Sequence, residues 1–192
     1  MPTLIATGFG PWGEHKQNAS WEGLSQLETT LPDGWALEKH QIPVSWYQAQ
    51  TCLDKLLSQK PDAFIAFGQC PDPYIRLERL ARNGSATDKE DIDGNTWPTS
   101  YIEPDGADSY PTTLPIQEIE SELKAAEIPN KPSDSAGDYL CNHLFYLLME
   151  RVKMDGREIP AGFIHVPELD KMDLSVLVEA ICIIILATTT FD

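Results

Sequence analysis

A cysteine near the start of an expected helix is the first candidate for chemistry. Cys141 follows a polar segment that contains Gly137, and the apolar spacing over residues 136–154 predicts a long helix. Unpaired backbone N–H groups and the helix dipole favour a thiolate in the first turns, and the same N–H groups could hold an oxyanion. Both features suit acyl transfer to a thiol. Position alone leaves open that Cys141 packs in the core, as free cysteines often do.

The other three cysteines have weaker claims to reactivity. Cys52 and Cys182 lie inside apolar helical patterns, so we expect them to pack in the core. Cys70 ends an expected strand and precedes Pro71, without a following helix N-terminus that would lower its pKa. We therefore expect Cys70 to line a pocket. The cysteines form no CxxC pair and have no histidines at zinc-finger spacing, which disfavours a zinc site.

One histidine has a suitable position for the base that a thiol hydrolase needs. His165 lies toward the end of residues 161–167, a glycine-opened apolar segment that reads as a strand, and open α/β sheets place their sites at that edge. His143 lies two residues beyond Cys141 on the same expected helix, so we expect it to point away from the thiol. Two other histidines are expected in a loop and on a strand surface: His15 and His40.

A carboxylate in an apolar setting could fix the tautomer of that imidazole. Glu78 lies in the sequence Leu-Glu-Arg-Leu, where a buried charge would call for a partner. Arg79 or Arg82 could supply this partner in a purely structural salt bridge. The residues by themselves favour that structural interpretation of Glu78 over a catalytic one.

Strands and helices alternate in the elements expected to position these residues. Strands are expected at residues 4–10, 36–44, 62–68, 75–81 and 161–167. Helices are expected at residues 20–30, 46–59, 115–126, 136–154 and 174–188, the first with Asn18 or Ser20 as N-cap. Residues 83–110 are predicted to form a long irregular excursion, and residues 129–134 a loop. This alternation predicts an α/β fold.

The composition limits the classes of protein to which the chain can belong. The 192 residues, 42% of them hydrophobic, suffice for one core, so we expect residues 1–192 to form a single domain. A formal charge of −16 repels phosphate backbones and anionic membrane surfaces, so neither nucleic acid nor a membrane is an expected partner. The chain starts without a secretory signal pattern, and its longest apolar stretch is too short to cross a membrane. We therefore expect a cytoplasmic protein.

Several separated blocks, in a fixed order along nearly the whole chain, resemble one known family. The two most specific are residues 135–142 (Ser-Ala-Gly-Asp-Tyr-Leu-Cys-Asn) and residues 161–167 (Ala-Gly-Phe-Ile-His-Val-Pro). The others are residues 7–9 with Pro11, and residues 18–21, 67–69, 78–79 and 113–115. Together these blocks resemble the pyroglutamyl peptidase I family, also called pyrrolidone-carboxylate peptidases.

The resemblance implies a fold, a reaction and roles for three residues. The implied fold is a three-layer α/β/α sandwich with a central mixed, mostly parallel sheet, in many members assembled as a homotetramer. The implied nucleophile is Cys141, the general base His165 and the acidic member Glu78. The implied reaction is hydrolysis of the amide bond after an N-terminal L-pyroglutamyl residue through a thioester, without metal or cofactor. The expected partners are therefore N-terminally pyroglutamylated peptides.

A small, neutral and flat lactam calls for an apolar wall with a few fixed polar groups. Phe9 and Trp12 fit this wall, and Trp12 stands where the family typically has phenylalanine. Gly68 and Gln69 are expected to present backbone and amide groups to the substrate, with Cys70 beside them. These five residues are the expected substrate-binding set.

Two loops depart from the family pattern. Asp88 stands where the family usually carries an arginine near the active site, and residues 70–73 replace a glycine-rich segment. Losing one preorganised donor lowers a rate by about 10²–10³. Lys89 is a poor geometric substitute for a guanidinium. Two alternatives therefore stay open: a catalytically weakened relative that binds pyroglutamyl peptides, and a thiol hydrolase of different acyl specificity.

Overall fold

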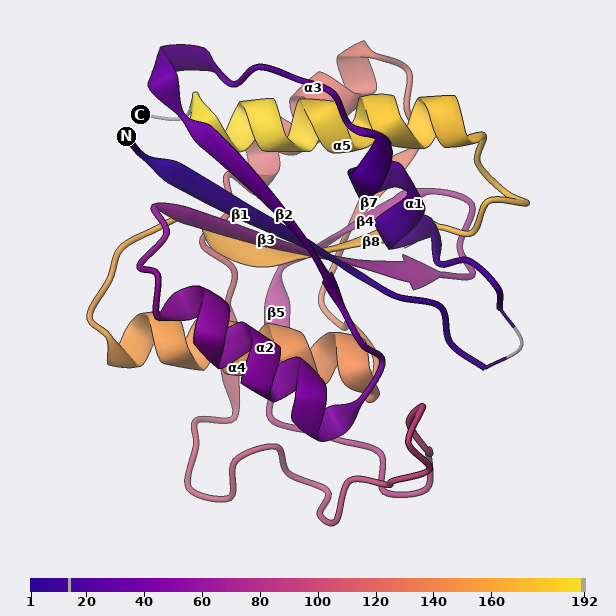
Figure 1. Cartoon of the computed structure of the whole chain (residues 1–192), viewed down its shortest axis with the longest axis vertical. Helices are drawn as coiled ribbons and strands as arrows, with labels where there is room; N and C mark the ends of the chain where they lie inside the picture. The colour runs from indigo at the N-terminus through magenta and orange to yellow at the C-terminus, as the bar shows by residue number, and fades with distance from the viewer. Residues whose placement is uncertain (14, 191–192) are drawn as a thin grey trace.

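A six-stranded sheet forms the centre of the computed structural model, which describes residues 1–13 and 15–190 (Figure 1). Its strand order is β2-β1-β3-β8-β4-β7. The strands are β1 (Thr3–Phe9), β2 (Ala36–Ile42), β3 (Ala63–Cys70), β4 (Ile75–Glu78), β7 (Asn130–Ser133) and β8 (Ala161–Pro167). The first four in this order are parallel, whereas β4 is antiparallel to β8 and parallel to β7. The expectation of a mixed, mostly parallel sheet is confirmed.

Helices cover both faces of this sheet, as Figure 1 shows. One layer contains α1 (Ala19–Gln26), α3 (Ile116–Ala125) and α5 (Leu174–Thr189). The other layer contains α2 (Trp46–Leu57) and α4 (Leu140–Met154). A short 3₁₀ helix, Pro32–Gly34, and a separate pair of antiparallel strands, β5 (Leu80–Arg82) and β6 (Ser109–Pro111), complete the elements. The result is the three-layer α/β/α sandwich expected from the sequence.

Each face of the sheet packs into its own core, because successive strand residues point to opposite faces. The α1/α3/α5 face buries aliphatic side chains such as Ile65, Leu77 and Ile164 against the three helices. The α2/α4 face buries larger aromatic side chains, among them Phe64 and Phe163. The candidate catalytic residues all lie on this second, α2/α4 face, as shown below.

Local sequence explains how β1 and α1 meet. The side chain of Asn18 is the N-cap of α1 and accepts a hydrogen bond from the backbone N–H of Ser20 at 3.2 Å. Ser20 Oγ in turn accepts from the N–H of Phe9 at 3.0 Å. A Cβ at Gly8 would lie 2.8 Å from the backbone of Ser20, so only glycine allows this close approach. The N-cap prediction is confirmed.

Four expected elements differ from those observed. The helix expected at residues 20–30 ends at Gln26. Residues 75–81, expected as one strand, divide at Arg79 into β4 and β5, which belong to different sheets. Residues 129–134, expected as a loop, contain edge strand β7, where Pro132 is tolerated because an edge residue need not donate to a ladder. The helix expected from residue 136 begins at Leu140, since Gly137 has a left-handed φ of +85°.

The most apolar helix is α5, which packs against the sheet with residues such as Leu177, Ile181 and Ile184 fully buried. Within the described residues, no helix combines the length and the apolar character needed to span a membrane.

Candidate active site

Cys141 is the second residue of α4, so the thiol lies at a helix N-terminus as expected. The N-cap residue, Tyr139, makes no side-chain cap hydrogen bond, and the first N–H groups of a helix have no partner within it. Asn142 fixes this end of the helix: its amide donates to the carbonyl oxygens of Arg82 at 2.8 Å and Gly84 at 2.9 Å. Its Oδ1 accepts from the N–H of Arg82 at 3.0 Å. The α4 N-terminus is therefore held rigidly enough to orient an oxyanion.

The Cys141 thiol lies against Gly68 on β3. A Cβ at Gly68 would lie 2.9 Å from Cys141 Sγ and 2.6 Å from the ring of Phe163. Gly68 is also the register partner of His165 on the neighbouring strand β8. Register partners on parallel strands point to the same face, so the thiol and the imidazole share the α2/α4 face at adjacent strands. Gly68 thus makes room for the sulfur beside the expected base.

His165 and Glu78 form a buried hydrogen-bonded pair. Nδ1 of His165 lies 2.7 Å from Oε1 of Glu78, and neither side chain is more than 5% exposed. The carboxylate comes from β4, which runs antiparallel to β8. A proton on Nδ1 that is donated to the carboxylate leaves Nε2 with its lone pair, the form required of a general base.

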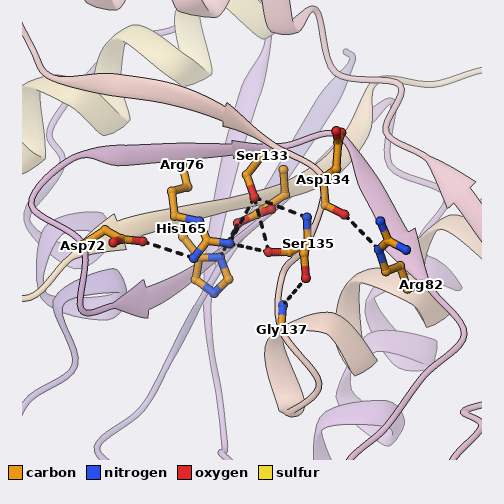
Figure 2. A network of polar contacts seen from close by, with 9 residues as sticks. Asp72, Arg76, Arg82, Ser133, Asp134, Ser135, Gly137 and His165 are labelled. Carbon is orange, nitrogen blue, oxygen red and sulfur yellow. Dashed lines mark hydrogen bonds and ion pairs between the residues drawn. The ribbon is translucent and has the colours of Figure 1, made fainter.

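Arg76 is a member of this cluster that the sequence interpretation missed. Its Nη2 lies 2.9 Å from Glu78 Oε1, so the guanidinium and His165 share one carboxylate oxygen. Nη1 contacts Asp72 Oδ2 at 3.2 Å, and Nη2 donates to Ser133 Oγ at 3.0 Å (Figure 2). Residues two apart in a strand share a face. Arg76 and Glu78 are two residues apart in the expected strand, and this spacing would have identified Arg76 as the partner of Glu78.

The expectation that Arg79 or Arg82 compensates Glu78 is wrong. Arg79 is half-exposed and binds both carboxylate oxygens of Asp134, at 2.8 and 2.6 Å. Arg82 Nε donates to the backbone oxygen of Asp134 at 2.9 Å (Figure 2). Arg79 directly follows Glu78 at the end of β4. Successive side chains point to opposite sides of the chain, so Arg79 points away from the side on which Glu78 lies.

A small cavity of about 170 Å³ opens beside the thiol. Sites for drug-sized ligands measure about 300–1,000 Å³, so this cavity suits a small acyl group. Its lining includes Phe9, Trp12, Gln69, Cys70, Tyr139 and Cys141. Four of the expected substrate-binding residues therefore line it, whereas Gly68 lies beneath the sulfur.

Two lining residues have neighbours that set their orientation. Trp12 is 39% exposed, with its ring 6.0 Å from His15 in a stacked pair and 5.6 Å from Tyr139. Gln69 Oε1 accepts from the backbone N–H of Ala19 at 2.7 Å, the first residue of α1. This contact uses the amide oxygen of Gln69 and leaves its NH₂ group as the end suited to a ligand carbonyl.

A larger cavity, of about 720 Å³, lies near the C-terminal end of α4. Tyr110, Met149, Lys153 and Pro160 are among its lining residues. Pro160 directly precedes β8, whereas His165 lies toward the other end of that strand. The larger cavity therefore contains none of the candidate catalytic residues.

Burial opposes the thiolate that the helix N-terminus was expected to favour. It raises the pKa of Cys141 to about 12, with the Cys70 and Glu78 charges acting in the same direction and Arg76 against them. The resting thiol is therefore protonated near neutral pH, and a base must take its proton during attack. Burial likewise raises the pKa of Cys70 to about 11, so the pKa does not distinguish the two thiols. Position does: Cys70 ends β3 and lines the cavity, whereas Cys141 lies in the first turn of α4.

His143 is a core residue. Its side chain is buried, its two ring nitrogens have no hydrogen-bond partner among the described residues, and burial lowers its pKa to about 3. Its ring packs edge-on against Trp46 at 5.2 Å and Trp97 at 4.4 Å. An aromatic environment of this kind holds a neutral imidazole and gives it no part in proton transfer.

The substituted loop provides no second guanidinium. Asp88 is exposed, and Lys89 forms an ion pair with Asp138 at 2.6 Å near the ring of Tyr139. The guanidinium that contacts the histidine–glutamate pair belongs to Arg76. Within residues 1–13 and 15–190, histidine, cysteine and carboxylate side chains form no group of three or more that could hold a metal ion.

A thiol at a helix N-terminus, a histidine–glutamate pair on the same sheet face and a small adjoining cavity are features of a cysteine hydrolase. Comparison with known proteins narrows this class. The family model described as pyroglutamyl peptidase matches residues 2–181. The chain therefore belongs to the pyroglutamyl peptidase family.

Relatives and solved structures agree with this family. A pyrrolidone-carboxylate peptidase of Thermoanaerobacter sp. is 36% identical over 168 residues, covering 86% of this chain and 82% of the relative. One from Bacillus licheniformis is 36% identical over 188 residues, covering 93% and 86%. The structure of pyroglutamyl peptidase I from Bacillus amyloliquefaciens superimposes with a TM-score of 0.93 at 30% identity, covering 100% of this chain and 97% of that one.

Proposed function

We propose that the protein is a cysteine exopeptidase that hydrolyses the amide bond after an N-terminal L-pyroglutamyl residue. Membership of the family supports the reaction. The single structural observation that supports the site is the contact of Cys141 Sγ with Gly68, the register partner of His165. Through this contact, the thiol that lines the small cavity lies on the same sheet face as the imidazole, on the neighbouring strand.

In the acylation step, Cys141 Sγ attacks the pyroglutamyl carbonyl carbon while His165 Nε2 takes the thiol proton. Glu78 stabilises the resulting imidazolium through Nδ1. The N–H groups at the start of α4 stabilise the oxyanion of the tetrahedral intermediate. As the C–N bond breaks, the imidazolium returns the proton to the leaving amine, and a thioester remains on Cys141.

In the deacylation step, water attacks the thioester carbonyl and His165 takes a proton from that water. The C–S bond breaks, the proton passes to the thiolate, and pyroglutamate leaves. The pKa of Cys141, raised by burial, favours this return of the proton and makes a base essential in the first step. The cycle consumes one water and regenerates the thiol and the neutral imidazole.

Recognition of the lactam rests on the cavity beside the thiol. Phe9 and Trp12 supply apolar surface, and the NH₂ group of Gln69 is placed to donate to a ligand carbonyl. The cavity of about 170 Å³ accommodates a compact neutral ring better than a long side chain. We therefore propose N-terminally pyroglutamylated peptides as the substrates.

We further propose that residues 1–192 act as one catalytic domain, in the cytoplasm, as a homotetramer. The cysteines at 52, 70, 141 and 182 are all free thiols, which suits a reducing compartment. The tetramer is carried by the family resemblance. Light scattering coupled to size exclusion tests it, since a mass of one or two chains would contradict it.

The activity is tested with pyroglutamyl, alanyl and glutaminyl aminomethylcoumarin amides, using the native chain and Cys141→Ala in parallel. Release from the pyroglutamyl amide alone, lost in the variant, is the expected result. Faster release from a linear acyl group would indicate a thiol hydrolase of different specificity. Binding of pyroglutamyl peptides without release from any amide would indicate a weakened relative.

A further inference from the structure

The carboxylate of Glu78 makes its polar contacts through one oxygen. Oε1 lies 2.7 Å from His165 Nδ1 and forms an ion pair with Arg76 Nη2 at 2.9 Å, whereas Oε2 has no hydrogen-bond partner among the described residues. The Glu78 side chain is 0% exposed. A buried carboxylate without a compensating cation takes up a proton or shifts position. Arg76, whose Nη2 lies 2.9 Å from Oε1, is the cation that compensates this carboxylate.

Arg76 also connects the pair to the segment before the nucleophile. Its Nη2 donates to Ser133 Oγ at 3.0 Å and to the backbone oxygen of Ser135. Figure 2 shows Asp72 on one side of the guanidinium and Ser133 and Ser135 on the other, and Arg76 is the register partner of His165 on β8. Ser135 lies five residues before Leu140, where α4 begins. One side chain, 21% exposed, thus contacts both the acid–base pair and the approach to the thiol.

We propose that Arg76 is a positioning residue for the peptidase reaction: its guanidinium compensates the buried charge of Glu78, aims that carboxylate at His165 and thereby sets the acid limb of the reaction. This inference rests on the proposed function of Cys141, His165 and Glu78. A cation beside the carboxylate offsets its negative charge, so the imidazole gains less from protonation. Because the thiol is protonated at rest, the reaction depends on an imidazole that is free to accept its proton.

The charged and titratable groups around the imidazole come from several elements. Arg76 and Glu78 on β4 and Asp72 before β4 form the cluster with His165, and Cys70 at the end of β3, Cys141 on α4 and Glu168 after β8 line the neighbouring cavity. Arg76 is the cation in this set, and Asp72 partly offsets it at 3.2 Å. Removing Arg76 should therefore favour proton uptake by the cluster, and removing Asp72 should oppose it.

The direct test compares Arg76→Gln with the native protein in the pH dependence of kcat/KM. We expect the acid limb to move to higher pH by about one unit, because a charge within about 4–6 Å of a titrating group shifts its titration by about that much or more. Arg79→Gln is the matched control, since Arg79 is the next arginine along and pairs with Asp134 at the surface. Its acid limb should coincide with that of the native protein.

Two further variants separate charge from tethering. Arg76→Lys keeps the cation but loses the fork that binds two groups at once. It should retain the native acid limb and lower kcat. Ser133→Ala removes one tether without changing charge, so it too should leave the acid limb in place. An Arg76→Gln protein that folds, loses thermal stability and keeps the native acid limb would reduce Arg76 to a structural tether and overturn the proposal.

Asp72→Asn provides an outcome of opposite sign that does not depend on the folding of Arg76→Gln. With Asp72 neutral, the guanidinium is less offset and the acid limb should move to lower pH. The pH dependence of Cys141 alkylation by iodoacetamide, followed by mass spectrometry, is a second measure of the acid limb. This measurement does not require turnover of a substrate. If the acid limb of alkylation shifts in the variants but no peptidase activity is found, the proposed function is contradicted and the role of Arg76 is supported. Unshifted limbs in Asp72→Asn would overturn the role of Arg76 even in an active peptidase.

Discussion

The two faces of the central sheet carry different kinds of side chain, although they alternate residue by residue along the same strands. On the α1/α3/α5 face, Leu77 and Ile164 are fully buried among aliphatic neighbours. Glu78 and His165 directly follow Leu77 and Ile164 in the sequence, and they form the buried polar pair on the α2/α4 face. Two consecutive residues of one strand therefore serve different purposes, one packing in the core and the other belonging to the proposed site, because the side chains of a strand point alternately to its two faces.

The comparison also shows what each face requires to be stable. The aliphatic face needs only close packing. The polar face also buries polar groups whose partners lower the cost of burial: Glu78 Oε1 contacts His165 and Arg76, and Asn142 bonds to backbone groups of Arg82 and Gly84. Substitutions on the two faces should therefore separate into losses of stability and losses of activity.

Replacing the proposed nucleophile should give the largest effect on activity. We expect Cys141→Ala to lower kcat by a factor on the order of 10⁶, the scale for removing the nucleophile of a coupled triad. Cys182→Ala, in α5 on the other side of the sheet, is the matched control and should keep native kcat. Release of aminomethylcoumarin and the thermal melting temperature measure the two effects. Comparable residual activity in the two variants would contradict the assignment of Cys141.

Removing the charge of the acidic member should have the next largest effect. We expect Glu78→Gln to lower kcat by about 10⁴, because the imidazole loses the acceptor that fixes its tautomer. Asp134→Asn removes a carboxylate that pairs with Arg79 at the surface and serves as the control. Steady-state kinetics give kcat for both variants, and only that of Glu78→Gln should fall. A Glu78→Gln protein with native kcat would make the buried pair a structural feature only.

The residue between Arg76 and Glu78 tests the aliphatic face. Leu77→Ala should lower the free energy of unfolding by about 2–5 kcal/mol, the cost of a cavity at a fully buried leucine. Activity per folded molecule should stay native, because Leu77 points away from the site. Urea unfolding gives the stability, and assays well below the unfolding midpoint give kcat. A change in kcat without loss of stability would break the division between the faces.

His143 predicts the smallest effect at neutral pH, because its contribution to stability changes only as the pH falls. Its pKa is about 3 in the folded state, lowered by burial from an unfolded value of 6.5. The unfolded chain therefore binds more protons between these values, and stability is lost as pH falls below 6.5 toward 3. The slope should approach about 1.4 kcal/mol per pH unit.

The variant that tests this dependence is His143→Phe, which keeps an aromatic ring between Trp46 and Trp97. Its free energy of unfolding, measured in urea at several acidic pH values, should fall less steeply than that of the native protein. His40→Gln is the control, since His40 is partly exposed on β2 and should leave the slope unchanged. Parallel curves for the native protein and His143→Phe would contradict the prediction.

Local signals predicted most elements and missed those that depend on distant partners. Strand β8 and helix α5 were predicted almost to the residue, because an unbroken apolar run and a helical period are properties of one segment. Strand β7 was missed, because Asn130–Ser133 is polar and becomes a strand only by pairing with β4 at the sheet edge. The start of α4 was placed too early, since Gly137 ends the extended approach just before it.

The amino-acid sequence by itself determined which residues could do chemistry: a cysteine at a helix start, a histidine toward a strand end and a carboxylate among apolar neighbours. It also determined the alternation of strands and helices, because hydrophobic periodicity is local. Only the tertiary structure decided that Gly68 brings the thiol to the strand of His165, and that Arg76 rather than Arg79 or Arg82 compensates Glu78. Those contacts join segments far apart in the chain, and burial removes the water that would otherwise screen their charges.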